Sequence, residues 1–448
     1  MGYISRNGRR PYENASRSSH SNIINDMAVK DFLTNCELPK SVDEVEISDT
    51  MLQQVPQINS NPIKHIIAID GGLTPVSVKK EFPSSTITFF QFGILSFSVS
   101  DLEGLADQAF IDPEDIAKLK NIQRLKLTLP TKNINIKGEK TLTNSIRNTL
   151  FQFFNQTIEG DNLLKTLEWF LFQDYCNPIT QWNLATCPNR HDEKHSTILE
   201  KKSMQSDYSF FCGTCGEKIL LTDVFRLHEA IDDELGAGGI LGYVVTLIEQ
   251  MLLVHILRMI INTKPSLLNE IMFIKDGPLA FFGQTANIHK PMRCLTNFLL
   301  EKYNLYLAGL EKSGFFVEHA NEIASKLKPG DLLLLNNNYI YKYIIPGKAD
   351  DNAPYARSSY YGAKLIYKAH NDGIHVITLP VKDEKVVLTP CKSDFKNIDI
   401  ILSNIEKLKC DMYDCSLIPV ALVNKLVSLA NHPSSVILEK FAKSNVKK

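Results

Sequence analysis

Residues 64–72 read KHIIAIDGG, and this stretch decides the expected fold. Four consecutive apolar residues followed by Asp70 and two glycines predict a buried strand that ends in a turn. Residues 269–276, NEIMFIKD, repeat the pattern, because an apolar run there closes with Asp276 before Gly-Pro. Both aspartates are therefore expected at the carboxyl ends of buried strands, where α/β sheets place their sites. For either residue alone, a turn-starting Asp is the plainer interpretation.

Glu249 lies in an apolar segment, GYVVTLIEQMLLVHILRMII, at residues 242–261. Read as a helix, this segment surrounds the carboxylate with apolar neighbours one turn away. A carboxylate in such surroundings is costly unless it is paired, hydrogen-bonded or bound to a cation. The alternative to a ligand role is a buried ion pair with Arg258 or another base.

These elements follow one another in a recognisable order. Strands are expected at residues 66–69, 74–80 and 86–100, as an antiparallel meander, and a helical region at residues 222–262 precedes the second strand that ends in Asp. This order predicts an α/β protein with a ribonuclease H-like mixed sheet flanked by helices. Three carboxylates that converge in such a fold suit one or two Mg²⁺ or Mn²⁺ ions, which prefer oxygen ligands and activate water for phosphodiester hydrolysis.

Between these elements lies a stretch rich in cysteine and histidine. It holds one C-x3-H pair and one C-x2-C pair flanked by glycines, a spacing typical of a structural tetrahedral Zn²⁺ site. The predicted ligands are Cys187, His191, Cys212 and Cys215. His195 or Cys176 are alternatives to His191. A redox dithiol at the C-x2-C pair is the rival interpretation, but the strand–helix context of such motifs is absent here.

Composition bounds the remaining possibilities. The net charge of −1 excludes a global positive field, so binding of nucleic acid requires a local patch. Basic residues in the Cys/His stretch are candidates for phosphate contacts, although a solvated loop face is as good an interpretation. They are Arg190, Lys194, Lys201 and Lys202. Nine cysteines form an odd and uneven set, which favours a reducing compartment over a disulfide scaffold.

Four segments are expected along the chain. Residues 1–60 form a polar extension that is partly disordered, and residues 61–175 begin the sheet and add helices near 112–119 and 144–168. Residues 176–220 form a zinc-ribbon-like insertion, and residues 221–448 complete the domain. The N-terminus lacks the apolar core of a signal peptide, and the longest uncharged apolar piece, residues 235–248, is shorter than the roughly 20 residues that span a bilayer. We therefore expect a cytoplasmic protein with no membrane contact.

The chain resembles the NurA nucleases, which are partners of HerA-type hexameric ATPases. The likeness extends over roughly residues 63–440 and is carried by IIAIDGGLTPVSVKKEFPSSTITFFQ, CGTCGEKILLTDVFRLHEAID, VTLIEQMLLVHILRMI and, most specifically, FIKDGPLAFFGQTA. Two C-terminal segments, SSYYGAKLIYKAHNDGIHVITLPV and SLIPVALVNKLVSLANHPSS, are also similar.

The resemblance implies a Mn²⁺-dependent DNA nuclease that forms a homodimer, docks on a HerA-type ring and acts in DNA end processing or anti-phage defence. It makes Asp70, Glu249 and Asp276 the catalytic metal acids. A further family stretch matches LTDVFRLHE, with Asp223, Arg226 and His228, whose role is open between function and helix capping with packing.

Two departures from the family pattern bear on activity. The first motif reads Asp-Gly-Gly where the family commonly has Asp-Gly-Ser, and Asn424 stands where the family often has a histidine. An amide neither titrates near neutral pH nor replaces imidazole as a proton relay. His432 is a substitute only if the chain bends back.

Three hypotheses follow. The first is a metal-dependent nuclease, and the second is a weakly active or inactive adaptor that binds DNA and the ATPase ring. The third is an actin-like or sugar-kinase-type phosphotransferase that uses Asp-Gly-Gly and the glycines at residues 236–239 as phosphate loops. No Walker-type loop supports the third.

Overall fold

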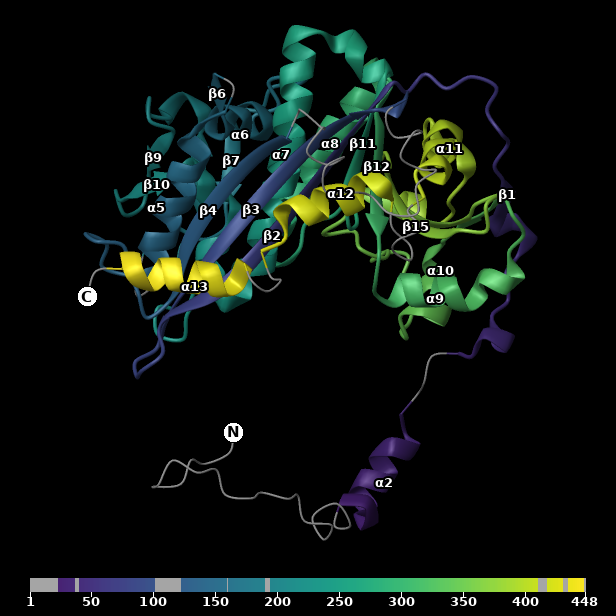
Figure 1. Cartoon of the computed structure of the whole chain (residues 1–448), viewed down its shortest axis with the longest axis horizontal. Helices are drawn as coiled ribbons and strands as arrows, with labels where there is room; N and C mark the ends of the chain where they lie inside the picture. Colours follow the sequence, from purple (N-terminus) through teal and green to yellow (C-terminus); the bar gives the residue numbers. More distant parts are fainter. Residues whose placement is uncertain are drawn as a thin grey trace.

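The computed structural model of the chain describes residues 23–36, 40–100, 122–158, 160–189, 194–409, 417–429 and 434–446. Its centre is a mixed β-sheet with helices on both faces (Figure 1). The order of the nine described strands is β1-β13-β14-β15-β12-β11-β2-β3-β4. Their bounds are β1 Leu52–Gln54, β2 His65–Lys79, β3 Ser85–Ser98, β4 Ile122–Lys132, β11 Ile271–Asp276, β12 Tyr306–Glu311, β13 Asp331–Leu334, β14 Gly362–Lys368 and β15 Ile374–Pro380. The predicted α/β class with a mixed sheet and flanking helices is confirmed.

The first predicted strand does not end at Asp-Gly-Gly. β2 runs straight through it as one strand of 15 residues, so the two strands predicted at residues 66–69 and 74–80 are a single element. The two glycines do not form a turn. They are needed because neighbouring groups approach the strand closely at these positions. A Cβ on Gly71 would lie 2.8 Å from the ring of Phe92, and one on Gly72 only 2.4 Å from the Val427 carbonyl oxygen.

The meander of three antiparallel strands exists, but with a different third member. β2 pairs with β3, and β3 pairs with β4, which the sequence pattern did not predict. After the meander, the chain returns through helices to β11, which pairs with β2 in parallel. The two strands that carry Asp70 and Asp276 are therefore neighbours in the sheet.

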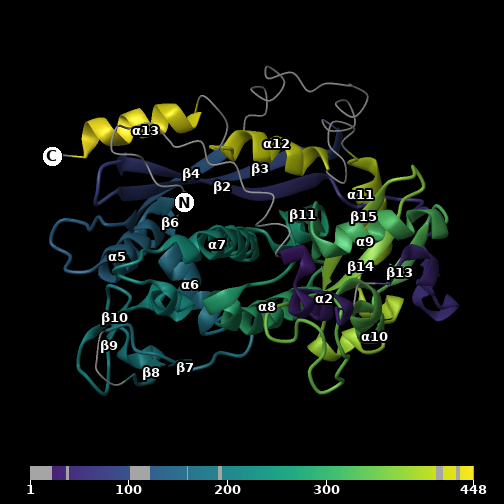
Figure 2. The same ribbon diagram turned by 90° about the horizontal axis from the view of Figure 1, so that it is seen from below.

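Helices cover the sheet unequally (Figure 2). The larger layer lies on one face and contains α5 Leu142–Asn155, α6 Leu163–Leu171, α7 Leu241–Thr263, α8 His289–Lys302, α9 Phe315–Ile323 and the short α10 Asn337–Tyr339. The opposite face carries α11 Ile398–Lys407, α12 Ile418–Val427 and α13 Ser434–Asn445. The helix predicted at residues 112–119 lies outside the described residues, and the one predicted at 144–168 is divided into α5 and α6 by the short strands β5 Thr157–Ile158 and β6 Asp161–Asn162.

Strand alternation explains the two cores. In β2, Ile67 and Ile69 belong to the cluster under α5, α6 and α7, whereas Ile66 and Ala68 belong to the cluster under α11 and α12. Successive side chains in a strand point to opposite faces, so a fully apolar run is required where both faces are covered. This is why KHIIAID has no polar residue between Lys64–His65 and Asp70.

The central helix α7 is buried between the sheet and its neighbours. Gly238–Thr263 is, among the described residues, the one helical stretch long and apolar enough to cross a bilayer, and 67% of its most apolar window is buried inside the molecule. It packs on β2 and α6. Burial on all sides accounts for its hydrophobicity.

Two small hairpins form the Cys/His insertion: β7 Gln181–Leu184 with β8 Thr197–Glu200, and β9 Ser209–Phe211 with β10 Lys218–Leu220. The N-terminal segment supplies β1 at the edge of the main sheet and, before it, α2 Met27–Thr34, none of whose residues is buried and which is set apart from the body (Figure 1). The boundaries of the four predicted segments stay predictions.

Candidate active site

Asp70 and Asp276 lie side by side on adjacent parallel strands. Ile69 in β2 is paired with Lys275 in β11, and each aspartate is the next residue of its strand. β11 ends at Asp276, where Gly277 turns the chain with a φ of +80°, whereas β2 continues. The two carboxylates therefore meet where one strand stops beside another.

Glu249 reaches the same region from α7. It is buried, and Val245, one helical turn earlier, lies against Gly71, since a Cβ there would be 3.0 Å from Val245 Cγ1. Residues four apart share a helix face, so Glu249 is directed to the segment of β2 that carries Asp70.

Burial and mutual repulsion determine the electrostatics of the three acids. Burial, followed by the charges of Asp276 and Glu249, raises the pKa of Asp70 to about 8. Burial also raises the pKa of Glu249, against the opposing effect of Lys275. The charge of Asp276 makes ionisation of both Asp70 and Glu249 costlier, as expected of carboxylates that lie near one another.

Asp70 has one satisfied and one unsatisfied oxygen. Its Oδ1 accepts a hydrogen bond of 2.8 Å from the Gly71 N–H, but its buried Oδ2 has no hydrogen-bond partner. The residue is 5% exposed. Buried polar atoms without a partner are rare in folded proteins, and an absent ion is one standard explanation.

Two lysines that the sequence analysis did not predict form ion pairs with Glu249 and Asp276. Lys275 Nζ lies 3.1 Å from Glu249 Oε2 and also donates to the main-chain carbonyl of Asp276. Lys312 Nζ lies 2.8 Å from Asp276 Oδ2. The buried ion pair given as the alternative for Glu249 is present, with Lys275 as the base, whereas Arg258 pairs with Asp161 at 2.8 Å. In this part of the described chain, the three acids do not form a group whose ligand atoms all lie within 4.8 Å of one another.

The donor set nevertheless fits a hard divalent cation. Three carboxylates offer only oxygen ligands, which Mg²⁺ and Mn²⁺ prefer. The unsatisfied Oδ2 of Asp70 is a ligand atom that lacks any other partner. The residues that would hold such an ion are Asp70, Asp276 and Glu249, and that they share one stays a prediction.

Asn424 lies on α12, on the face of the sheet opposite α7, and its side chain is exposed. The C-terminal end of this helix is fixed to the meander, since Gln91 Nε2 donates to the Leu426 carbonyl at 2.6 Å. His432 lies outside the described residues. The glycines at residues 236–239, the suggested nucleotide loop, pack against β4, where the Ala237 N–H donates to the Thr131 carbonyl at 2.9 Å.

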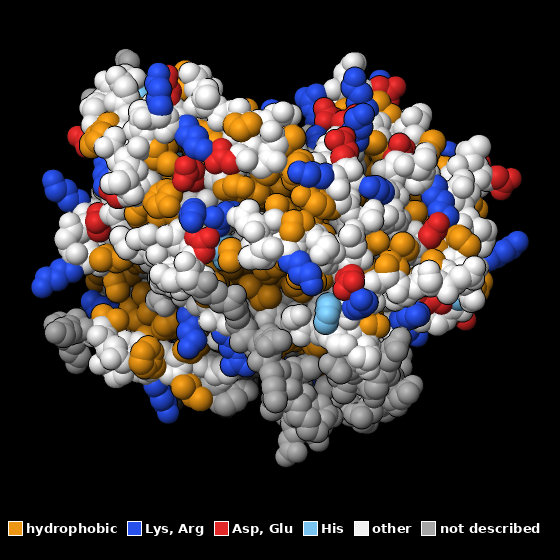
Figure 3. All heavy atoms as spheres, turned by 90° about the horizontal axis from the view of Figure 1, so that it is seen from above, with side chains coloured by type: hydrophobic (Ala, Val, Ile, Leu, Met, Phe, Trp, Pro, Cys, Tyr) orange, Lys and Arg blue, Asp and Glu red, His pale blue; other side chains and the backbone are white. Residues whose placement is uncertain are grey.

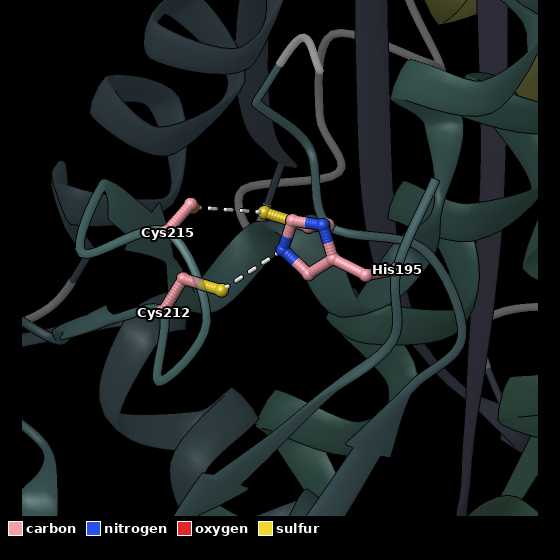
Figure 4. A group of neighbouring side chains, drawn as sticks. His195, Cys212 and Cys215 are labelled. Atoms are coloured by element: carbon pink, nitrogen blue, oxygen red, sulfur yellow. Dashed lines mark hydrogen bonds between the residues drawn. The ribbon is translucent and has the colours of Figure 1, made fainter. Parts of the chain in front are cut away.

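A second group of candidate ligands lies in the two small hairpins. Four side chains bring their ligand atoms within 4.8 Å of one another: Cys187, His195, Cys212 and Cys215. His195 thus takes the place predicted for His191, which lies outside the described residues; Cys176 is exposed and separate from the cluster. Figure 4 shows the imidazole of His195 facing the cysteines of the C-x2-C turn.

The distances suit a tetrahedral metal site. Cys187 and Cys215 have their sulfurs 3.9 Å apart, and His195 Nε2 lies 3.2 Å from Cys212 Sγ. Zn–S bonds of about 2.3 Å at a tetrahedral angle place sulfurs about 3.8 Å apart. Burial raises the pKa of the Cys212 thiol, but backbone N–H groups of Cys215 and Thr214 and the His195 ring outweigh it and lower the pKa to about 6. The turn therefore favours a thiolate, the form that ligates a metal.

LTDVFRLHE connects this insertion to the helical layer. Asp223 accepts two hydrogen bonds of 2.8 Å from the Arg147 guanidinium on α5 and one of 2.8 Å from the Leu220 N–H. His228 Nε2 lies 3.2 Å from the Thr186 carbonyl, and Arg226, at a φ of +60°, pairs with Glu229. These contacts agree with the capping and packing interpretation of the stretch.

Two of the basic residues of the insertion form ion pairs with nearby carboxylates. Lys201 pairs with Asp174 at 2.6 Å, and Lys202, whose side chain is 83% exposed, lies 3.1 Å from Glu200; Arg190 lies outside the described residues. On the face that Figure 3 shows, Lys and Arg side chains are scattered among neutral and apolar ones and do not form one basic stripe.

No protein-family model and no curated protein matches this sequence. Two solved structures align with nearly its whole length. The crystal structure of the NurA nuclease from Sulfolobus solfataricus aligns with a TM-score of 0.33 and 8% identity over 96% of this chain and 97% of that one. A second crystal structure of NurA aligns with a TM-score of 0.30 and 10% identity over 97% and 98% of the two chains. Scores of this size do not establish a shared fold, so a functional assignment depends on the geometry of the site itself.

Proposed function

We propose that this protein is a Mn²⁺- or Mg²⁺-dependent DNA nuclease of the NurA type. The observation that carries the proposal is the pair Asp70 and Asp276 on adjacent parallel strands, with a buried, unbonded oxygen on Asp70 and with Glu249 on α7 near enough for its charge to raise the pKa of Asp70. A bound divalent ion would supply a more acidic water and charge stabilisation at the scissile phosphate.

A ribonuclease H-like fold is part of the proposal. Its support is the strand order β4-β3-β2-β11-β12, in which a meander of three antiparallel strands is followed by two strands parallel to the first. The last α-helix between the meander and β11 is α7, which carries Glu249.

The residues of the chain have distinct tasks in this proposal. Asp70 and Glu249 are almost fully buried, so the sheet and α7 keep water from one side of the site. Asp276 and Lys312 are each about a quarter exposed, with side-chain values of 23% and 24%, and they form the side open to substrate. The Lys312 ammonium is thus the group placed to attract a phosphate.

Zn²⁺ is the metal we propose for Cys187, His195, Cys212 and Cys215, in a structural role. Its support is a set of four N and S ligands at tetrahedral spacing with no oxygen ligand among them. The remaining proposals rest on the resemblance to NurA: a homodimer in the cytoplasm that works with a HerA-type hexameric ATPase in DNA end processing or anti-phage defence. Co-purification of this protein with a co-expressed HerA-type ATPase tests that partnership. An ATPase that does not co-purify would contradict it.

The nuclease proposal is tested by conservative replacement of the acids. Asp70→Asn, Glu249→Gln and Asp276→Asn are each expected to lower Mn²⁺-dependent degradation of linear DNA by about 10³-fold or more, because each removes a charge that binds or positions the ion. Asp372→Asn is the matched control: this aspartate is exposed and has a φ of +65°, which Asn tolerates. Full activity in a folded Asp276→Asn protein would refute the proposal.

One observation favours a second candidate, a catalytically weak adaptor that binds DNA and the ATPase ring. Lys275 and Lys312 already neutralise Glu249 and Asp276, and Asn424 replaces the family histidine. Calorimetry with Mn²⁺ distinguishes the two candidates. Ion binding that Asp70→Asn abolishes supports the nuclease, and no binding in the unmodified protein supports the adaptor.

A further inference from the structure

Lys275 is a buried cation next to the last residue of β11, Asp276, and it pairs with Glu249. It is 5% exposed, and it lies on the same face of β11 as Ile271 and Phe273, the face covered by α7. An ammonium group placed there loses its water shell, which is costly unless nearby oxygens replace it. Glu249 and the Asp276 carbonyl are two such oxygen groups.

The position of Lys275 differs from that of Lys312. The side chain of Lys312 is 24% exposed, so it has room to turn into solvent when a ligand approaches Asp276. The side chain of Lys275 is 6% exposed, as is its partner Glu249, and it is enclosed by sheet and helix. Lys275 is therefore a permanent part of the site, and Glu249 is permanently paired.

The charges of the site limit the number of ions it can hold. With Lys312 turned towards solvent, Asp70, Glu249 and Asp276 carry three negative charges when ionised, and Lys275 carries one positive charge. One divalent ion brings the sum from −2 to 0, whereas two ions bring it to +2 in a buried region. Unbalanced charge of that size is strongly disfavoured in a low-dielectric environment.

We propose, on the basis of the nuclease function above, that the site holds a single divalent ion, ligated by Asp70 and Asp276, and that the ammonium group of Lys275 takes the place of a second ion beside Glu249. Asp70 is the ligand that lacks any hydrogen-bond partner for one oxygen, and Asp276 is its neighbour across the parallel pair. Glu249 is then a positioning residue, because it acts through Lys275.

The number of bound ions tests this directly. Zinc-loaded full-length protein is titrated with Mn²⁺, with free Mn²⁺ followed by electron paramagnetic resonance and heat by calorimetry. We expect one Mn²⁺ per chain, lost in Asp70→Asn. Two ions per chain in the unmodified protein, with the exchange-coupled spectrum of ions about 4 Å apart, would overturn the inference while leaving the nuclease function intact.

Substitution of Lys275 tests whether its ammonium group takes the place of a second ion. Lys275→Met is expected to raise the count from one to two, because Glu249 is left without a cation; Lys275→Arg is expected to keep it at one. Lys342→Met, which removes a half-exposed lysine paired with Glu46, is the matched control and should bind one ion. If folded Lys275→Met still binds one ion, the inference is wrong. Absence of both binding and DNA cleavage in the unmodified protein overturns the proposed function as well.

Discussion

At the scale of single residues, His375 makes the stability of the fold sensitive to acid. It lies in β15, is 3% exposed, and neither ring nitrogen has a hydrogen-bond partner. Burial, helped by the nearby charge of Lys409 and opposed by Glu406, lowers its pKa from 6.5 to about 4. The unfolded chain binds a proton more readily than the folded one between these values, so this contribution to stability is complete above pH 6.5 and declines as the pH falls towards 4.

We therefore predict that His375→Leu flattens the pH dependence of stability. The unmodified protein should lose about 2 kcal/mol of unfolding free energy through this residue between pH 7 and pH 5, and the variant should not. Urea unfolding at several pH values measures the difference, with His65→Asn, at an exposed position, as the control. Parallel pH profiles for the unmodified and His375→Leu proteins would contradict the prediction.

The candidate site was predictable in part at this scale. The apolar runs before Asp70 and Asp276 and the apolar setting of Glu249 pointed to these acids, although β2 continues past Asp70, and their role as ligands stays a prediction. Lys275 and Lys312 were not identified, because a lysine in the sequence does not reveal which carboxylate it meets after folding. Spacing alone also left His191 and His195 as alternatives; the Cys187 N–H donates to the His195 carbonyl at 2.8 Å, which holds His195 at the ligand position.

At the scale of elements, the contact between β2 and α12 depends on Gly72. A Cβ there would lie 2.4 Å from a carbonyl oxygen of the helix backbone, which has little freedom to move. Gly72→Ser, which adds a side chain at this contact, is expected to destabilise the protein by about 1–3 kcal/mol through overpacking.

Guanidinium unfolding measures this effect. Gly242→Ser provides the matched control, because a Cβ at Gly242 meets no atom within 4 Å. Equal stabilities of the two serine variants would show that α12 is displaced without cost.

The contact between β2 and α12 also explains why the sequence pattern predicted two strands in place of one. Asp-Gly-Gly is a standard turn composition, so the sequence pattern predicted two strands where β2 is one. Local propensity was overridden by tertiary packing, since the glycines admit Phe92 on one face and α12 on the other. β4 was not predicted although Leu125, Leu127 and Leu129 alternate with polar residues in its sequence, IQRLKLTLPTK; the strand also contains a proline, which its edge position tolerates.

At the scale of the whole molecule, the Cys/His insertion is continuous with the main core. Buried residues from its hairpins belong to the same hydrophobic cluster as the helices α5, α6 and α7: Leu184, Leu199, Phe210 and Ile219. The buried pair Arg147–Asp223 adds a polar connection. Loss of the proposed zinc should therefore weaken the entire fold and not release an independent unit.

We predict that a chelator, or Cys212→Ser, lowers the melting temperature by about 5 °C or more in a single transition. Metal content from mass spectrometry and a calorimetric scan check this. Cys176→Ser, an exposed cysteine outside the cluster, is expected to retain zinc and stability. Two separate transitions in the chelated protein would show that the insertion unfolds on its own.

The packing of α12 across β2 has a consequence for biosynthesis. The strand that carries Asp70 leaves the ribosome more than 300 residues before the helix that covers one of its faces, Ile418–Val427. Until that helix is made, this apolar face of β2 and β3 lacks the cover that α12 provides. The nascent polypeptide is thus a candidate client for chaperones, and a product that stops before α12 would be prone to aggregate.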